Sequence, residues 1–353
     1  MPSGARLLPL VALTLLLASC RGAPVVTTNA PVASAAATSV GVMPASRIER
    51  LDPAIDALIP ADARVEKLAD GFDWVEGPVW RRDKGYLLFS DIPKNTIYKW
   101  KDGEGVSVFL RPAGYAGPTP QGRELGTNGL TTDARGALVV ADHGNRMIAR
   151  VSDSLFTKSP LAERYEGKRF NSPNDLVYRA NGDLYFTDPP YGLFKLNEDP
   201  VKELPFNGIY RLTPTGTVTL LDRDLTFPNG IALSPDGNTL YVALSDGRNP
   251  FIWAYDVQAE GVTNKRMFFD ARPLIQRGLR GHLDGMKVDA KGNVFATGPG
   301  GVLVLSPQGK HLGTIVAGDI TANVAFGDDG ATLYMTSNHA LTRVRTSTRG
   351  LGF

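Results

Sequence analysis

The chain has 353 residues, and its 38 basic and 36 acidic side chains give a net charge of +2. Because neither sign of charge forms a long run, the sequence lacks the basic footprint expected of a nucleic-acid-binding protein. The 38 glycines and 25 prolines are spread through the chain. This distribution indicates many short strands joined by turns, and the length leaves room for one large β domain.

The first twenty residues are typical of an export signal. Arg6 precedes an apolar stretch at residues 7–18 that is too short to span a bilayer comfortably. The stretch ends in "LASC", which resembles the lipobox of bacterial lipoproteins and implies cleavage before Cys20 and lipid attachment to its thiol. Cys20 is the only cysteine, so no intramolecular disulfide can form. We therefore predict a lipoprotein-type signal peptide at residues 1–20, with an ordinary secretory signal as the alternative.

The predicted anchor places the protein on the periplasmic side of a bacterial membrane, attached only through its N-terminal lipid. Residues 21–50 are rich in alanine, proline and threonine and have neither helical nor strand periodicity. With few large apolar side chains they cannot bury a core, so we expect a flexible tether. The folded domain is predicted to occupy residues 51–353.

One pattern recurs through the rest of the chain: a polar residue, a short apolar strand, a turn with Asp or Gly, and a second apolar strand. Successive copies begin 52, 46, 55, 55 and 38 residues apart. They are "EGPVWRRDKGYLLFSD" (76–91), "NGLTTDARGALVVAD" (128–142), "NDLVYRANGDLYFTD" (174–188), "NGIALSPDGNTLYVALSD" (229–246), "DGMKVDAKGNVFATG" (284–298) and "ANVAFGDDGATLYMTS" (322–337). Repeats of about 40 to 55 residues built in this way are typical of propeller blades.

Six copies predict an all-β, six-bladed β-propeller. The last copy has room for only three strands, and "ARVEKLA" (63–69), ahead of the first copy, can supply the missing outer strand and close the ring. A β-sandwich or a tandem pair of small β domains is the alternative, but neither has a reason to repeat one motif six times.

The residues that open the copies fall at equivalent positions, which converge on the central channel of a propeller. They are Glu76, Asn128, Asn174, Asn229, Asp284 and Ala322. Turn chemistry explains any single Asn-Gly pair, but it explains neither Glu76 nor the recurrence at one register. A ring of carboxylates and carboxamides offers the oxygen ligands that a hard divalent cation such as Ca²⁺ takes from protein. The pattern therefore predicts a metal site in the channel.

The segments "WVEGPVW", "SPNDLV", "FPNGIALSPDGNTLYV" and "DGMKVDAKGNVFAT", in this order, resemble the gluconolactonase and senescence-marker-protein (regucalcin) family. The resemblance covers roughly residues 61–345 and implies a six-bladed propeller with one catalytic divalent metal. It places the metal ligands at Glu76, Asn174, Asn229 and Asp284. In some members the residue matching Asn174 contacts substrate instead. Ca²⁺ is the expected ion, with Mg²⁺, Mn²⁺ and Zn²⁺ as alternatives.

Substrate-binding residues are expected around this site. Asn128 is assigned to substrate or to a metal-bound water. Ser172 stands where vertebrate members carry a sugar-contacting arginine, so their substrate preference does not transfer. Asp188 and Tyr191, in "TDPPYG", could line the channel mouth or could simply form a rigid turn.

The expected reaction is hydrolysis of a sugar lactone, with the metal polarising the carbonyl and activating water. Asp284 is the candidate proton acceptor and donor, as in the family it resembles. The histidines at 143, 282, 311 and 339 are expected to be structural or at the rim, and no His-Glu-x-x-His or Gly-x-Ser-x-Gly motif occurs. Another lactone or an organophosphate ester is an alternative substrate, and a non-catalytic binding module is the alternative function. The partner is then a small-molecule lactone, and the sequence leaves the oligomeric state open.

Overall fold

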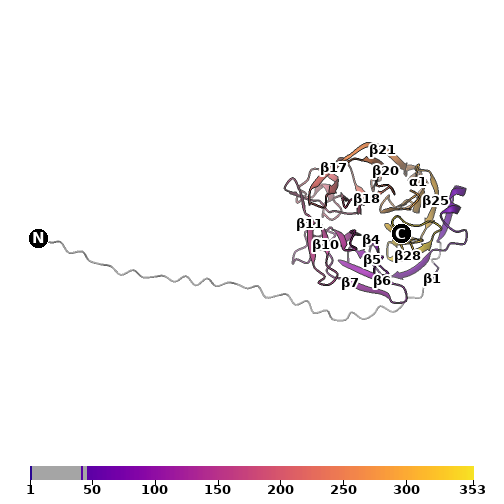
Figure 1. Ribbon diagram of the computed structural model, residues 1–353, viewed down its shortest axis with the longest axis horizontal. Helices are drawn as coiled ribbons and strands as arrows, with labels where there is room; N and C mark the ends of the chain where they lie inside the picture. Colours follow the sequence, from indigo (N-terminus) through magenta and orange to yellow (C-terminus); the bar gives the residue numbers. More distant parts are fainter. Residues whose placement is uncertain (2–40, 43–45) are drawn as a thin grey trace. The chain divides into compact units, whose positions relative to one another are not determined.

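Six small antiparallel sheets form a ring around a central axis (Figure 1), which confirms the predicted propeller. The computed structural model describes residues 1, 41–42 and 46–353. The predicted signal peptide, Cys20 and most of the predicted tether lie outside the described residues. Within the described part of the chain, no helix is long and apolar enough to cross a membrane.

Each blade is a meander of strands that runs from the axis outward. Blade 1 is β4 (Val75–Arg81), β5 (Tyr86–Asp91), β6 (Thr96–Lys101) and β7 (Gly105–Leu110); blade 2 is β8 (Thr127–Thr132), β9 (Leu138–Asp142), β10 (Met147–Val151) and β11 (Lys158–Ala162). Blade 3 is β14 (Leu176–Tyr178), β15 (Leu184–Asp188), β16 (Asn207–Leu212) and β17 (Val218–Leu225); blade 4 is β18 (Pro228–Leu233), β19 (Thr239–Leu244), β20 (Phe251–Val257) and β21 (Val262–Asp270). Blade 5 is β22 (Met286–Val288), β23 (Val294–Gly298), β24 (Gly301–Leu305) and β25 (His311–Val316), and blade 6 is built on β26 (Asn323–Gly327), β27 (Thr332–Ser337) and β28 (Ala340–Arg345).

The remaining elements are short. They are the hairpin β12 (Arg164–Tyr165) and β13 (Lys168–Arg169), the 3₁₀ helices η1 (Pro53–Ala57) and η2 (Leu196–Glu198), and the helix α1 (Arg272–Gln276).

The hydrophobic core lies between neighbouring blades. Tyr185 of blade 3 packs with Ile231 and Val242 of blade 4 in one buried cluster, and Trp80 of blade 1 stacks on Tyr334 of blade 6 with ring centroids 5.5 Å apart. Because both faces of each sheet are covered, inner strands such as β9, "LVVAD", are buried along their whole length. This explains why the second strand of most repeats is a continuous apolar run.

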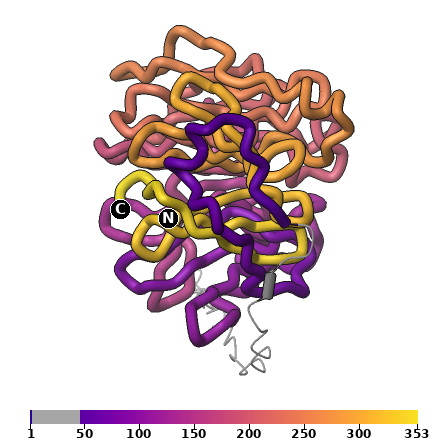
Figure 2. Tube along the Cα trace, turned by 90° about the vertical axis from the view of Figure 1, so that its right-hand side faces the viewer, coloured from indigo at the N-terminus to yellow at the C-terminus, as the bar shows by residue number. Residues whose placement is uncertain are grey.

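The ring closes by pairing of its two ends. β3 (Glu66–Asp70) runs antiparallel to β28, with Ala340 opposite Asp70, and Arg343 Nε donates to Glu66 Oε2 at 2.8 Å. Figure 2 shows the N-terminal segment running beside the C-terminal strands. The predicted closing strand at 63–69 is therefore confirmed to within about three residues.

Two segments assigned to the tether are in fact paired strands. β2 (Arg47–Arg50) pairs with β25, with Arg47 opposite Val316, and β1 (Gly41–Val42) pairs with β3. The prediction of an unstructured 21–50 segment is wrong at these residues. "RIER" places one apolar side chain, Ile48, against the core, while the outer edge of blade 5 supplies the backbone partners. Because three of these four residues are charged, the tetrapeptide lacks the apolar pattern that would predict a strand from sequence.

Candidate functional site

The ring position defined by the repeat recurs structurally in all six blades. Glu76, Asn128 and Asn229 lie near the starts of β4, β8 and β18, whereas Asn174 and Asp284 stand two residues before β14 and β22. Pairing between the first and second strands is interrupted at the ring residue in blades 1, 2 and 4, because the register shifts there. Such local breaks re-aim a side chain away from the sheet face, as β-bulges do beside active sites.

Glycine follows the ring residue in four blades, and the reason is close approach at the axis. A Cβ on Gly77 would lie 2.1 Å from the backbone oxygen of Asn128, and one on Gly230 would lie 2.1 Å from that of Asp284. Asn229–Gly230 is inside β18 rather than in a turn, so turn chemistry does not explain it. Only glycine lets the ring residue of the next blade come this near.

Hydroxyl groups on the second strands hold the same backbone in place. Ser90 Oγ donates to the Asn128 carbonyl at 2.8 Å, and Thr187 Oγ1 donates to the Asn229 carbonyl at 2.7 Å. Each bond links a blade to the next one around the axis. The ring backbone is therefore tied by buried hydrogen bonds, which favours a rigid site.

The two ring carboxylates are electrostatically coupled. Glu76 is buried and Asp284 is partly exposed. Burial raises the pKa of both groups, and for Asp284 the charge of Glu76 is the next cause in the same direction. A bound cation would remove this repulsion by favouring both charged forms.

Asp175 is a third carboxylate at this site, and our sequence analysis missed it. It occupies the position that glycine takes in four other blades and is 1% exposed. Its Oδ1 accepts from the Leu176 amide at 2.8 Å, while its Oδ2 is buried without a partner among the described residues. Its charge raises the pKa of Glu76 and of Asp284. The only sequence signal was the break in the glycine pattern at "PND".

The donor set fits a hard divalent cation. Glu76 and Asp284 supply charge, Asn229 and Asn174 supply carboxamides, and the Oδ1 of Asn128 is buried with no hydrogen-bond partner among the described residues. No group of three or more His, Cys, Asp and Glu side chains arranged for a metal occurs in the described part of the chain. The proposed ligand set therefore depends on its carboxamides.

Two predicted substrate residues bury their side chains in local structure. Asp188 is fully buried and accepts from the amides of Asn171 and Ser172, each at 2.8 Å. Ser172, also fully buried, donates through Oγ to the Pro189 carbonyl at 2.6 Å and accepts from the Gly192 amide at 2.9 Å. This geometry does not support direct substrate contact by either residue. Both shape the loop that presents Asn174.

Tyr191 does lie beside the site. Its ring stacks on Phe227 with centroids 5.8 Å apart. Its hydroxyl is buried and has no hydrogen-bond partner among the described residues. Burial raises its pKa, with the Asp284 charge acting in the same direction and nearby Ser245 and Asn229 opposing it. An unpaired hydroxyl near Asp284, Asn229 and Ser245 is suited to bind a polar substrate.

The four histidines differ in their surroundings. His311 Nε2 lies 3.0 Å from Thr314 Oγ1 and His339 Nδ1 lies 2.9 Å from the Phe72 carbonyl, which suits the predicted structural role. His282 is exposed. His143 is buried near the ring, with Nδ1 2.8 Å from Glu124 Oε2 and Nε2 3.5 Å from Asn174 Nδ2.

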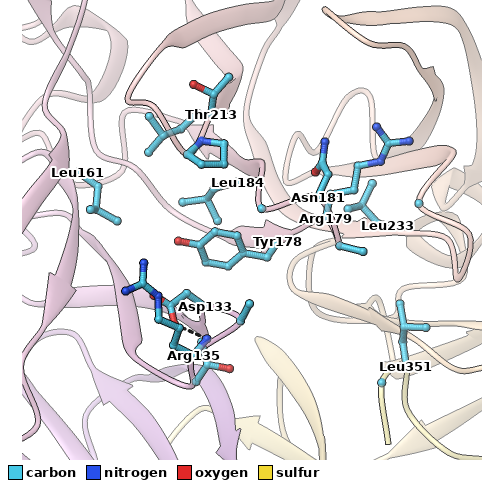
Figure 3. A pocket seen from close by; sticks show the side chains of 18 of the residues that line it. Asp133, Arg135, Leu161, Tyr178, Arg179, Asn181, Leu184, Thr213, Leu233 and Leu351 are labelled. Carbon is cyan, nitrogen blue, oxygen red and sulfur yellow. Dashed lines mark hydrogen bonds between the residues drawn. The ribbon is translucent and has the colours of Figure 1, made fainter.

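Two cavities lie at the ends of the inner strands that are farthest from the ring residues. One of about 650 Å³ is lined by residues of all six innermost strands, including Val79, Leu176 and Val288. The other, of about 1010 Å³, lies against the turns of blades 2 to 4, with Tyr178 and Leu184 among its lining residues (Figure 3). No predicted ligand residue lines either cavity, so the ring forms a separate site.

The molecule is a six-bladed β-propeller with carboxylates and carboxamides at the inner strands of its blades, and comparison with known proteins identifies its family. Residues 74–339 match the family described as SMP-30/Gluconolactonase/LRE-like region. The chain belongs to this family, which confirms the resemblance.

Several known proteins are similar to this chain over most of its length. A protein of Zymomonas mobilis named gluconolactonase is 41% identical over 324 residues, covering 90% of this chain and 91% of its own. The solved structure of a gluconolactonase from Xanthomonas campestris is 30% identical with a TM-score of 0.77, covering 88% and 98% of the two chains. A calcium-binding regucalcin from Agrobacterium tumefaciens, 20% identical with a TM-score of 0.61, covers 80% and 92% and shows the shared fold.

Proposed function

We propose that this protein is a metal-dependent lactonase that opens a sugar lactone of the gluconolactone type. The observation that carries the proposal is the axial ring, in which Glu76 and Asp284 interact electrostatically beside unpartnered oxygen donors. Two relatives named gluconolactonase, each matched over most of its length, support the substrate class.

The residues that would hold the cation are Glu76, Asn174, Asn229 and Asp284. A calcium-binding relative with the same fold favours Ca²⁺. When bound, the cation supplies Lewis-acid polarisation of a carbonyl and a more acidic water. Asn128 and Tyr191, whose polar atoms are buried without partners among the described residues, are assigned to substrate.

Asp284 is the group we assign to proton transfer, because it is the partly exposed one of the two ring carboxylates. As water oxygen bonds to the lactone carbonyl carbon, the water proton passes to the Asp284 carboxylate. The bond between that carbon and the ring oxygen then breaks, and the proton returns to the ring oxygen, which leaves as a hydroxyl. The product is a hydroxy acid, and all atoms come from lactone and water.

The test is hydrolysis of glucono-1,5-lactone by the chelator-stripped chain, with Ca²⁺, Mn²⁺ or Zn²⁺ added back, compared with Asp284→Asn. We expect metal-dependent turnover in the wild type and a loss of about 10²- to 10⁴-fold in the variant, the usual contribution of general acid–base catalysis. Metal binding without turnover would redirect the search to other lactones and esters. If no metal binds, the axial ring has another role and a binding module becomes the better explanation.

The export signal predicted at residues 1–20 adds a location to this proposal. A lipid on Cys20 would hold the enzyme at the periplasmic side of a bacterial membrane, where it would meet extracytoplasmic lactones. Labelling with a radioactive fatty acid, lost on Cys20→Ser, tests this part independently.

A further inference from the structure

The carboxamide of Asn229 is oriented by a chain of two hydrogen bonds. Ser245 Oγ donates to the Leu283 carbonyl at 2.5 Å, and Asn229 Nδ2 donates to Ser245 Oγ at 2.8 Å. Because the serine proton is already used, Ser245 can only accept from Asn229. The amide group therefore faces Ser245, and the carbonyl oxygen of Asn229 is turned away from it.

Asn174 has a corresponding support that comes from blade 2. His143, which follows β9, places Nε2 3.5 Å from Asn174 Nδ2, at the long end of hydrogen-bond distances. On the other side of the ring, Nδ1 lies 2.8 Å from Glu124 Oε2. A hydrogen bond from Nδ1–H to this carboxylate selects the tautomer of the neutral imidazole in which Nε2 carries the lone pair. That lone pair can receive a hydrogen bond only from the amide of Asn174.

We propose that Glu124 and His143 form a positioning pair that fixes the Asn174 carboxamide with its oxygen free to act as a ligand. The inference rests on the proposed metal site and deepens it. His143 is buried and its Nε2 lies beside Asn174, so we assign it to act through Asn174. Among the described residues, the side-chain hydrogen bond of Asn174 is the one from Nδ2 to His143, which leaves Oδ1 available as a ligand. Outer partners of this kind orient metal ligands in other proteins.

Calcium affinity of the chelator-stripped full chain, measured by titration calorimetry at one pH, tests the pair. His143→Leu keeps the volume but removes the acceptor, and we expect Ca²⁺ to bind about 10- to 100-fold more weakly. His143→Gln can place an amide oxygen near the Nε2 position and should restore most of the affinity. Rescue by this variant distinguishes positioning from simple packing.

Two further variants test whether a loss of affinity could come from misfolding. Glu124→Ala changes a side chain that is 23% exposed, so the fold should tolerate it, and we expect a smaller loss of affinity because the tautomer is no longer fixed. His311→Leu, on the outer strand β25, serves as the control and should bind Ca²⁺ like the wild type.

The outcomes separate this inference from the proposed function. If the wild type binds Ca²⁺ and folded His143→Leu or Glu124→Ala binds it equally well, the positioning pair is overturned while the metal site stands. If the wild type itself binds no divalent cation, both are overturned.

Discussion

The ring residues show how one short sequence pattern serves two purposes at the same place. In four blades the first residue of the pair supplies a side-chain oxygen, and the glycine after it makes room for the neighbouring blade. In blades 3 and 6 the second position is Asp175 or Asn323, whose side chain instead caps the amide of the residue that follows. Spacing along the chain predicted the first role but not the second, since close approach between blades is a property of the assembled ring.

Gly230→Ala should therefore disturb both stability and the site. The added Cβ would meet the Asp284 backbone oxygen at 2.1 Å, so the inner strands must shift, at a cost of about 1–3 kcal/mol in the free energy of unfolding. We expect lactone turnover to fall as well, because Asp284 moves. Urea denaturation and initial rates measure the two effects.

The matched control is Gly261→Ala, where a Cβ meets nothing within 4 Å. It should change stability by no more than about 0.5 kcal/mol. Equal effects of the two substitutions would contradict the close-approach explanation.

Among the elements, the strands were predictable and the contacts that fix the loops were not. The six repeated units could be predicted because every blade packs against its neighbours with similar residues. The closing strand at 63–69 could be predicted because the last repeat lacks a fourth strand. β2 escaped detection since its pairing comes from the edge of blade 5. The roles of Asp188, Ser172 and His143 also escaped, because their partners are set by the paths of loops rather than by local sequence.

Asp188 should impose a pH dependence on stability. Burial raises its pKa to about 7, against an ordinary value of 3.8. The folded state therefore holds this proton more tightly than the unfolded chain, and stability should fall as pH rises from about 4 to 7 and level off above that window. Melting temperatures at pH 5 and pH 8 test this, and Asp188→Asn should show a smaller difference than the wild type. An unchanged difference would assign the pH dependence to other groups.

Arg81 links the first two blades through an ion pair in which the arginine is buried and its partner, Asp153, is partly exposed. Its guanidinium binds both carboxylate oxygens of Asp153, at 3.0 and 2.7 Å, and also the Gly136 carbonyl at 2.9 Å. Asp153→Ala leaves the buried Arg81 guanidinium with Asp83, 3.9 Å from Nε, as its remaining acidic partner, so we expect a loss of about 1–3 kcal/mol in the free energy of unfolding.

The exposed pair Arg266–Asp256, at 2.6 Å, provides the comparison. Asp256→Ala should cost no more than about 1 kcal/mol, because solvent screens that pair. Chemical denaturation of both variants decides whether burial sets the difference.

At the scale of the whole molecule, the fold depends on a few residues near its N-terminus. β3 is the outer strand of blade 6, and Leu68 and Ala69 pack with Tyr334 and Leu341 in one buried cluster. β3 leads directly into β4 of blade 1, so this strand joins the first blade to the last.

A chain that lacks residues 1–71 should therefore lose the closed ring. We expect a lower melting temperature and a broader transition, since the outer edge of β28 is left unpaired and its core face uncovered. Differential scanning calorimetry of the two chains measures both. A transition as sharp and as high as that of the full chain would show that closure by β3 is dispensable.

The pairing of Glu66 with Arg343 joins residues 277 apart in sequence. Closing a loop of that length costs about 5 kcal/mol in chain entropy before other contacts compensate, and topologies with such distant contacts fold slowly. The last blade cannot form until synthesis is nearly complete, because three of its strands are the last to leave the ribosome. An unfinished chain thus carries β3 as an unpaired edge throughout its synthesis, and such an edge can pair with other chains and aggregate until β28 is made.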